Sequence, residues 1–166
     1  MAKGDVSVNI TDTVKFNFRV AGLIEHNNRV LLHMMGDVDF WNMPGGRVQA
    51  DEDTLTALKR ELDEEIGFKA DNAKLIEVAE NFFGFGGKRY HELLFVYKIV
   101  AHDSDKITSQ QDFAPFDKTD AVYHWFDKSE VKDAKCLPRL IYELATRDTT
   151  KFIHSVDIDN NRTILE

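Results

Sequence analysis

The stretch that decides the fold is GRVQADEDTLTALKRELDEEIGF, which occupies residues 46–68. Three of its glutamates, Glu61, Glu64 and Glu65, stand at positions i, i+3 and i+4. Such positions share one face of a helix, because each residue turns the chain by about 100°. A parallel apolar stripe is formed by Leu55, Leu58, Leu62 and Ile66. The segment therefore predicts an amphipathic helix over about 52–66, with one buried side and one carboxylate side.

The ends of this segment carry helix boundary signals. Asp51, Glu52 and Asp53 suit the positive N-terminal end of a helix. Gly67 suits the left-handed conformation that commonly follows the last helical turn. The segment is entered from Pro44-Gly45-Gly46, and glycines let a backbone approach another group closely.

Carboxylates crowded on one helix face repel one another unless a positive group lies between them. A divalent metal ion is the simplest such group, and oxygen ligands suit Mg²⁺, Mn²⁺ or Ca²⁺. The alternative is an acidic helix face that is merely solvated, which is the commoner situation. The spacing of the whole segment favours the metal.

That spacing resembles the Nudix box, G-x5-E-x7-R-E-U-x-E-E-x-G-U, in which U is a bulky aliphatic or aromatic residue. The nine fixed positions are all matched, by Gly46, Glu52, Arg60, Glu61, Leu62, Glu64, Glu65, Gly67 and Phe68. So many constrained positions rarely coincide by chance. The chain thus resembles the MutT-like Nudix hydrolases, and the resemblance covers about residues 16–146.

The resemblance implies a metal-dependent hydrolase that cleaves the pyrophosphate linkage of a nucleoside diphosphate joined to another group X. The expected cofactor is Mg²⁺, with Mn²⁺ as a substitute, because such ions neutralise phosphate charge and lower the pKa of the attacking water. By match to the box, the expected metal ligands are Glu61, Glu64, Glu65 and a backbone carbonyl at Gly45 or Gly46. Whether Glu64 or Glu65 deprotonates the water is left open.

Other charged residues are candidates for supporting roles. Arg60 is assigned to the catalytic group, where it is expected to anchor the glutamates by ion pairing, with a phosphate contact as the alternative. Glu52 is a candidate further ligand. Outside the box, Glu80 and Glu92 are the candidates for an additional carboxylate. His91-Glu92 begins an otherwise apolar segment, which fits either a cleft or a strand end in water.

Substrate contacts are expected from aromatic and basic residues outside the box. A nucleobase can stack on any flat π face, and Trp41, Phe83 and Tyr90 are the candidates. Packing in the core is the competing interpretation, since the chain holds 12 phenylalanines. Arg19 and Arg47 are candidates for phosphate contact.

The rest of the chain predicts strands around one sheet. The expected order is a hairpin turning at Asn27-Asn28, the acidic helix, a second hairpin, a short strand and a second helix with Pro138 in its first turn. The strand segments expected outside the first hairpin are 74–83, 89–100, 121–126 and 151–158. The first 14 residues are expected to form an edge strand or an arm. Residues 102–120 are expected to form a loop. The fold class is α/β, a Nudix-type α/β/α sandwich with a mixed β-sheet between helices. All 166 residues are assigned to one domain.

Bulk properties exclude several function classes. A net charge of −8 disfavours nonspecific binding to a nucleic acid polymer. The single cysteine, Cys136, allows no internal disulfide and suits a reducing compartment. No apolar run is long enough for a membrane span, and no apolar signal segment is seen, so a cytoplasmic location is expected.

Within the resemblance, a nucleoside triphosphate or related nucleotide is the favoured substrate. A nucleotide sugar, ADP-ribose or a dinucleotide is the second substrate class, and a non-catalytic nucleotide-sensing domain is the alternative function. The intact box favours catalysis over sensing. Homodimers are common in the family, and the sequence leaves the oligomeric state open.

Overall fold

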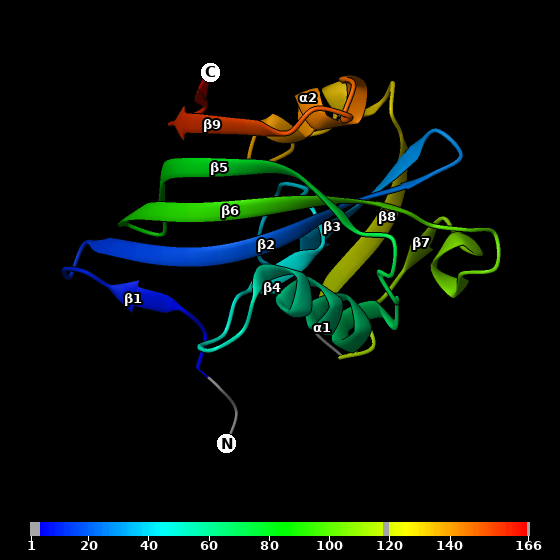
Figure 1. Cartoon of the computed structure of the whole chain (residues 1–166), viewed down its shortest axis with the longest axis horizontal. Coiled ribbons are helices and arrows are strands. Elements are labelled where there is room, and N and C mark those ends of the chain that lie inside the picture. The colour runs from blue at the N-terminus through cyan, green and yellow to red at the C-terminus, as the bar shows by residue number, and fades with distance from the viewer. Residues whose placement is uncertain (1–3, 118–119, 166) are drawn as a thin grey trace.

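The computed structural model describes residues 4–117 and 120–165, and its centre is a mixed ten-stranded β-sheet (Figure 1). The strands in chain order are β1 (Ser7–Asn9), β2 (Val14–His26), β3 (Arg29–Met35), β4 (Gly45–Arg47), β5 (Lys74–Phe85), β6 (Lys88–Val100), β7 (Asp112–Phe113), β8 (Ala121–Asp127), β9 (Ile153–Ile158) and β10 (Asn161–Leu165). The helices of the described residues are α1 (Thr54–Ile66) and α2 (Leu140–Thr146), with 3₁₀ turns at Lys106–Thr108 and Val131–Asp133.

Strand β2 organises the sheet because both of its edges are paired. One edge runs parallel to β6 from Val14 to Glu25. The other edge pairs in succession with β1, β4 and β3, each antiparallel to it. The full order is β10-β9-β5-β6-β2-β3-β8-β7, with β1 and β4 attached to β2. The glycine-rich strand β4 is therefore built into the sheet, where Arg47 lies opposite Arg19 of β2.

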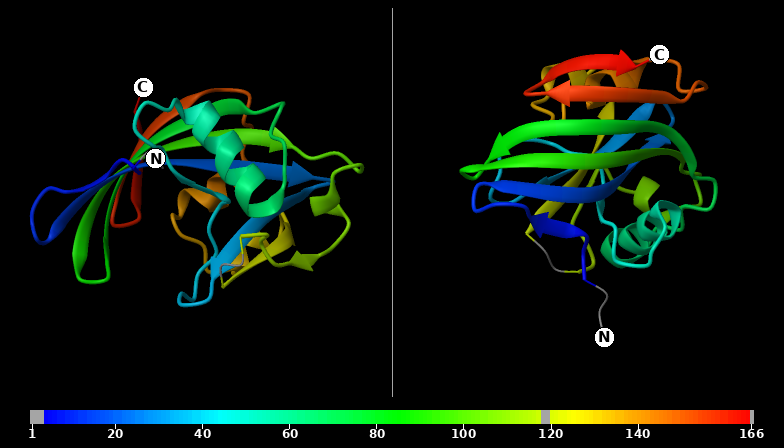
Figure 2. Two further views of the ribbon diagram at one scale, coloured as in Figure 1. Left: turned by 90° about the horizontal axis from the view of Figure 1, so that it is seen from below. Right: turned by 60° about the vertical axis from the view of Figure 1, so that its left-hand side comes forward.

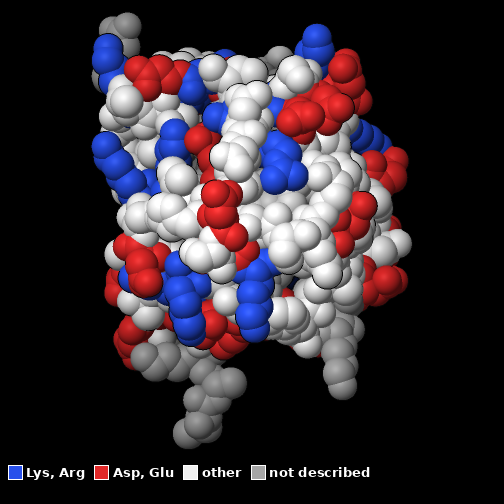
Figure 3. Space-filling view, turned by 90° about the vertical axis from the view of Figure 1, so that its right-hand side faces the viewer, with Lys and Arg blue, Asp and Glu red and all other residues white. Residues whose placement is uncertain are grey.

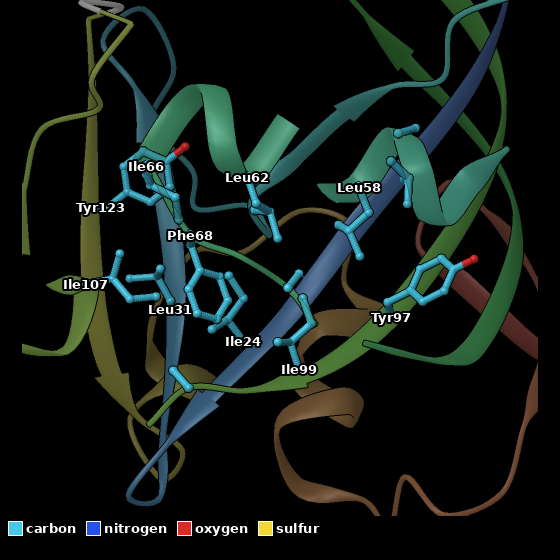
Figure 4. Close-up of a cluster of buried hydrophobic side chains, with 14 of the residues drawn as sticks. Ile24, Leu31, Leu58, Leu62, Ile66, Phe68, Tyr97, Ile99, Ile107 and Tyr123 are labelled. Atoms are coloured by element: carbon cyan, nitrogen blue, oxygen red, sulfur yellow. The ribbon is translucent and has the colours of Figure 1, made fainter. Parts of the chain in front are cut away.

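Successive side chains of β2 point to opposite faces of the sheet, and each face is covered by one helix (Figure 2). Val20 faces the apolar stripe of α1, in the cluster that Figure 4 shows around Leu58 and Leu62. Ala21 faces the other way, into a cluster that includes the buried residues of α2, namely Leu140, Ile141, Leu144 and Ala145. The expected α/β/α sandwich with a mixed sheet is therefore confirmed.

Both predicted hairpins are present. Asn27 and Asn28 turn the chain between β2 and β3 with φ angles of 45° and 62°, which asparagine tolerates better than most residues. Gly86 and Gly87 make the turn between β5 and β6, with φ angles of 57° and 76°. Each turn thus has the residue type that its backbone conformation requires.

Three segments differ from what the sequence pattern indicated. Helix α2 begins at Leu140, so Pro138 precedes the helix instead of occupying its first turn. Within 102–120, the described residues form a 3₁₀ turn and strand β7 rather than an uninterrupted loop. Strand β10 was not expected, because its exposed and partly polar residues lack the apolar alternation of a buried strand. A turn at Asp159–Asn160, with φ angles of 50° and 68°, brings it back against β9.

No helix of the described residues is both long and apolar enough to cross a membrane.

The face at the right-hand end of Figure 1 carries acidic and basic side chains interspersed with one another (Figure 3). It presents no broad basic area of the kind that binds along a nucleic acid backbone.

Candidate active site

Helix α1 presents its glutamates in a fixed direction because both of its ends are capped. At the N-terminus, Oδ1 of Asp53 accepts hydrogen bonds from the backbone N–H groups of Leu55 and Thr56, each at 3.0 Å. At the C-terminus, Gly67 adopts φ 64° and its N–H bonds the carbonyl of Asp63 at 3.0 Å. A side-chain N-cap of this kind stabilises a helix by about 1 kcal/mol. With the apolar stripe held in the core, Glu61 and Glu65 flank it and are partly buried, while Glu64 is exposed.

Arg60 lies at the centre of the acidic side. Its Nε and Nη2 bind the two carboxylate oxygens of Glu52 at 2.8 and 2.9 Å, a bidentate pair. Its Nη1 donates to Oε1 of Glu61 at 2.7 Å and lies 3.5 Å from Oε2 of Glu64. Its Nη2 also donates to the carbonyl of Arg47 at 3.1 Å. The hydrogen bonds to Glu52 are the main cause that raises the pKa of Arg60 above its usual value.

The glycines before the helix are required by close contacts. A Cβ on Gly46 would overlap the carboxylate of Glu61. A Cβ on Gly45 would overlap the carbonyl of Val20, and Gly45 has φ 142°, which L side chains rarely adopt. Gly46 therefore lets the backbone of β4 lie directly against the acidic side of α1, and Gly45 lets the same strand lie close against β2.

Glu65 is held from the opposite strand by Tyr123 of β8. The tyrosine hydroxyl donates to Oε2 of Glu65 at 2.6 Å. Burial raises the pKa of Glu65 to about 7; the Tyr123 hydrogen bond opposes the rise, whereas the charges of Glu61 and Asp117 add to it. No sequence pattern indicated that Asp117, between β7 and β8, would lie near this carboxylate.

His33 supports Tyr123 from the neighbouring strand. Its Nδ1 lies 3.3 Å from the tyrosine oxygen. Burial, followed by the positive charge of Arg19, lowers the pKa of His33 to about 3, so the ring is neutral near pH 7. The Tyr123 hydroxyl uses its hydrogen in the bond to Glu65, so its oxygen can only accept a hydrogen bond from His33. The hydrogen of the neutral imidazole is therefore assigned to Nδ1, which donates to the tyrosine oxygen.

The donor set suits a hard divalent cation. Within the described residues, no three His, Cys, Asp or Glu side chains already converge as a metal-binding group, and Arg60 supplies the positive charge beside Glu61. Burial nevertheless raises the pKa of Glu61 and of Glu65, so their negative charge is incompletely compensated. Carboxylate oxygens on a rigid helix, beside a backbone admitted by Gly46, are the ligands that Mg²⁺ or Mn²⁺ prefers.

The two further candidate carboxylates lie on opposite faces of the sheet. Glu92 is paired with Asn81, and Glu80, one residue earlier on β5, therefore points to the other side. Glu80 lies 2.9 Å from Nε2 of His154 on β9. Glu92 is 4% exposed and faces a cavity. From the sequence, Glu80 and Glu92 are both candidates for one additional carboxylate, but the structure places them on opposite faces of the sheet.

The cavity has a volume of about 350 Å³ and opens on the side of the sheet that α2 covers. Five residues predicted as substrate contacts or further ligands line it together: Arg19, Arg47, Phe83, Tyr90 and Glu92. Trp41 packs instead against Phe126, with 4.9 Å between ring centroids, and the preceding Phe40 lines the cavity.

Four asparagines of the cavity were not foreseen: Asn17, Asn42, Asn81 and Asn160. Alternation along β2 places Asn17 on the same face as Arg19, and alternation along β5 places Asn81 with Phe83. The alternation is visible in the sequence, but it identifies these residues as cavity-lining only once the structure shows which face of the sheet α2 covers.

Strand β4 joins the cavity to the acidic side of α1. Arg47 lines the cavity with its side chain, and its carbonyl accepts the hydrogen bond from Arg60. Its neighbour Gly46 lies against Glu61. Strand β4 is therefore the element that the cavity lining and the acidic side of α1 have in common, although none of Glu61, Glu64 and Glu65 lines the cavity itself.

Comparison with known sequences gives a consistent family. A sequence model of the NUDIX domain matches residues 15–144. An 8-oxo-dGTP diphosphatase of Buchnera aphidicola subsp. Schizaphis graminum is 30% identical over 123 residues, which cover 72% of this chain and 83% of that protein. An RNA pyrophosphohydrolase of Teredinibacter turnerae is 26% identical over 141 residues, which cover 76% of this chain and 80% of that protein.

Solved structures share the fold. A MutT protein from Bacillus halodurans has a TM-score of 0.64 at 18% identity, and the match covers 90% of this chain and 95% of that one. A MutT NUDIX hydrolase from Burkholderia pseudomallei has a TM-score of 0.56 at 22% identity, covering 77% of this chain and 96% of that one. Likeness at these identities establishes the arrangement of sheet and helices.

Proposed function

The chain belongs to the NUDIX family of hydrolases, and from this premise we propose that it is a pyrophosphohydrolase of a nucleoside triphosphate or a related nucleotide. The observation that carries the proposal is the position of β4, because Arg47 lines a cavity of about 350 Å³ and its carbonyl accepts a hydrogen bond from Arg60 on the acidic side of α1. That volume suits a small molecule of nucleotide size. The two sequence relatives are both named for hydrolysis of phosphoric anhydrides, which supports the same type of bond here.

NUDIX hydrolases generally use divalent metals, and we propose Mg²⁺ for this chain, with Mn²⁺ as a substitute. Glu61, Glu64, Glu65 and the backbone carbonyl of Gly46 would hold it. When bound, such an ion neutralises phosphate charge and lowers the pKa of water.

The protein's own residues position this carboxylate group. Arg60 fixes Glu61 and Glu52, so that neither side chain needs ordering when a ligand arrives. Tyr123 fixes Glu65 through Oε2. Glu64 has a side chain that is 62% exposed and only a distant contact with Arg60, which favours it over Glu65 as the group that accepts the proton of the water.

Arg19 and Arg47 are proposed to bind the phosphates. They are paired across β2 and β4 at the side of the cavity nearest the acidic helix. Arg47 is 43% exposed and lies 3.6 Å from Asp5, a weak ion pair that an incoming phosphate would outcompete. Their charge compensates a substrate that would otherwise be repelled by the acidic chain.

Hydrolysis of a nucleotide panel tests the proposal. Nucleoside triphosphates, ADP-ribose, nucleotide sugars and dinucleotides are incubated with Mg²⁺ or Mn²⁺, and products are separated by anion exchange. We expect a nucleoside monophosphate and pyrophosphate from at least one triphosphate, and loss of turnover by about a hundredfold or more in Glu64→Gln. The exposed Glu130→Gln is the matched control and should retain full turnover.

Two outcomes would contradict the proposal. Preferred cleavage of ADP-ribose or a nucleotide sugar would show that the protein acts on the second substrate class and not on nucleoside triphosphates. Tight nucleotide binding without turnover under any metal condition would favour a sensing domain instead.

A further inference from the structure

A row of buried polar side chains crosses the sheet beneath the cavity. Strand register places Asn17 of β2 beside Glu92 of β6, Glu92 beside Asn81 of β5, and Asn81 beside Asp157 of β9. Their exposures are 6%, 4%, 5% and 1% in that order. Burying polar groups is costly unless each finds a partner, so such a row in a sheet requires an explanation.

Contacts within the protein satisfy only part of this row. Oγ of Ser7 donates to Oδ1 of Asn17 at 2.6 Å. Nδ2 of Asn81 donates to Oε1 of Glu92 at 3.3 Å. Among the described residues, no other side-chain hydrogen bond reaches these three cavity-lining groups. Nδ2 of Asn17, the second oxygen of Glu92 and Oδ1 of Asn81 therefore remain for a ligand.

These remaining groups have a defined hydrogen-bonding order. Taken across β2, β6 and β5, they offer a donor, an acceptor and an acceptor. The complementary ligand edge carries an acceptor followed by two donors. Guanine has this edge in its O6, its N1–H and its exocyclic N2 amino group. A charged carboxylate is the strongest acceptor for two neighbouring N–H groups.

The other bases do not match this order. Adenine presents an amino donor where Asn17 also offers a donor, and an acceptor opposite Glu92. Uracil would place an acceptor opposite the Asn81 oxygen, which is also an acceptor. Cytosine carries a donor and two acceptors in the same order as the protein, so none of its groups finds a complementary partner. Hypoxanthine matches the first two positions but lacks the amino group, which makes it the most informative comparison.

The walls of the cavity suit a flat ring above this row. Phe83 and Tyr90 lie directly opposite one another on β5 and β6, two residues from Asn81 and Glu92 on the same face. Their rings are stacked with centroids 5.1 Å apart and an interplanar angle of 3°. Phe85 also lines the cavity, with its ring 6.3 Å from that of Phe40. A base held against these rings would place its edge within reach of the polar row.

We propose that Glu92, flanked by Asn17 and Asn81, selects a guanine-type base, meaning any purine that carries the O6, N1–H and N2 amino edge. This inference rests on the proposed function, because it assigns the base of the nucleotide that the site would hydrolyse. Glu92 would contact substrate directly, and Asn81 would both orient Glu92 and accept from the amino group.

The main experiment compares kcat/KM for dGTP, dITP and dATP in the wild-type protein and in Glu92→Gln. We expect the wild type to prefer dGTP over dATP by between about tenfold and a hundredfold, because guanine N1–H can donate to Glu92 and adenine N1 cannot, while dITP, which lacks only the amino group facing Asn81, should lie between them. Glu92→Gln turns an N–H donor toward N1 of the base, so kcat/KM for dGTP and dITP should fall together and the dGTP to dATP ratio should drop to about one or below. Asp157→Asn is the matched control: it lies in the same row, does not line the cavity, and should keep the wild-type ratio.

A binding measurement separates this inference from the proposed function. Dissociation constants of GMP, IMP and AMP are measured by calorimetry without metal, where no hydrolysis occurs. GMP should bind more tightly than AMP in the wild type, with IMP between them, and the preference over AMP should vanish in Glu92→Gln. Equal affinities for GMP and AMP, or hydrolysis of dGTP and dATP with equal kcat/KM, would overturn base selection while leaving the hydrolase intact. Hydrolysis of no nucleotide, with GMP still preferred, would instead count against the proposed function alone.

Discussion

The hydroxyl of Tyr123 donates a 2.6 Å hydrogen bond to Oε2 of Glu65, a residue 58 positions earlier in the chain. The bond joins β8 to the acidic side of α1, across the edge of the core. It links the carboxylate group to a strand that carries none of the box residues.

Replacing Tyr123 by phenylalanine should therefore impair the site more than the fold. We expect a loss of about 1–3 kcal/mol in unfolding free energy, because the bond is to a charged group, and a fall in kcat/KM of about tenfold as Glu65 loses its orientation. Urea unfolding and steady-state kinetics measure the two effects. Tyr142→Phe removes a hydroxyl that bonds the backbone of Ala134 and Cys136, and it should cost stability without changing kcat/KM. An equal kinetic loss in both variants would refute a specific role for Tyr123.

Gly46→Ala should abolish metal-dependent turnover while sparing most of the fold. The added methyl group would overlap the Glu61 carboxylate and push it from its position beside Arg60. Mn²⁺ affinity by calorimetry should fall at least tenfold, since displacing a ligand by about 1 Å is costly at a metal or catalytic site. Gly4→Ala, where a methyl group meets nothing within 4 Å, is the control. Unchanged Mn²⁺ binding in Gly46→Ala would remove Glu61 from the proposed ligands.

Arg60→Lys should destabilise the protein although it keeps the charge. Lysine cannot reproduce the bidentate contact with Glu52, whose side chain is only 8% exposed. We expect a loss of about 2 kcal/mol, below the range for fully buried pairs because Arg60 is 21% exposed. In a domain of this size, that corresponds to a drop of about 4–8 °C in Tm.

The neighbouring Lys59→Gln provides the control for Arg60. Lys59 lies 3.6 Å from Asp71, and both side chains are well exposed. Such surface pairs contribute at most about 1 kcal/mol, so Tm should change little. Similar shifts in the two variants would show that Arg60 acts only through its charge.

His33 should make the protein more sensitive to acid. Its folded pKa of about 3 lies below the unfolded value of 6.5, so the unfolded chain takes up the proton first as pH falls. Stability is therefore unaffected by this group above pH 6.5 and decreases progressively between pH 6.5 and about 3. At pH 5 the expected loss is about 2 kcal/mol.

His33→Gln removes the titrating ring and retains a donor for Tyr123. The difference in unfolding free energy between pH 8 and pH 5, measured with urea, should shrink by about 2 kcal/mol relative to wild type. His102→Gln, at an exposed position, should leave that difference unchanged. If His33→Gln retains the full wild-type difference, other groups cause the acid sensitivity.

The acidic helix was predictable because its signals are local. Its apolar stripe, the three acidic residues at its start and the left-handed Gly67 all lie within one stretch of sequence. The structure has the stripe and Gly67 in the expected roles, and of the three acidic residues Asp53 caps the helix, which begins at Thr54. The hairpin at Asn27–Asn28 was predictable for the same reason. Local patterns determine local structure when every signal agrees.

The contacts made to the helix from elsewhere were not predictable in this way. Tyr123 and Asp117 reach Glu65 only through the pairing of β8 with β3, and sequence alternation identifies the face of a strand but not its neighbours. By contrast, Arg60 was expected to anchor the glutamates by ion pairing, and the structure has it paired with Glu52 and Glu61. The polar row beneath the cavity depends on the register of four strands, which no single segment encodes.

In the proposed function, the three residues of β4 lie between the cavity that would hold the base and the helix face that would hold the metal. Their position is determined by backbone hydrogen bonds to β2 and not by the side chains of the cavity. Substitutions in the cavity can therefore change which base is held without changing how far its phosphates extend toward α1. Specificity and bond cleavage can thus vary independently in this fold, provided that Gly45 and Gly46 are retained.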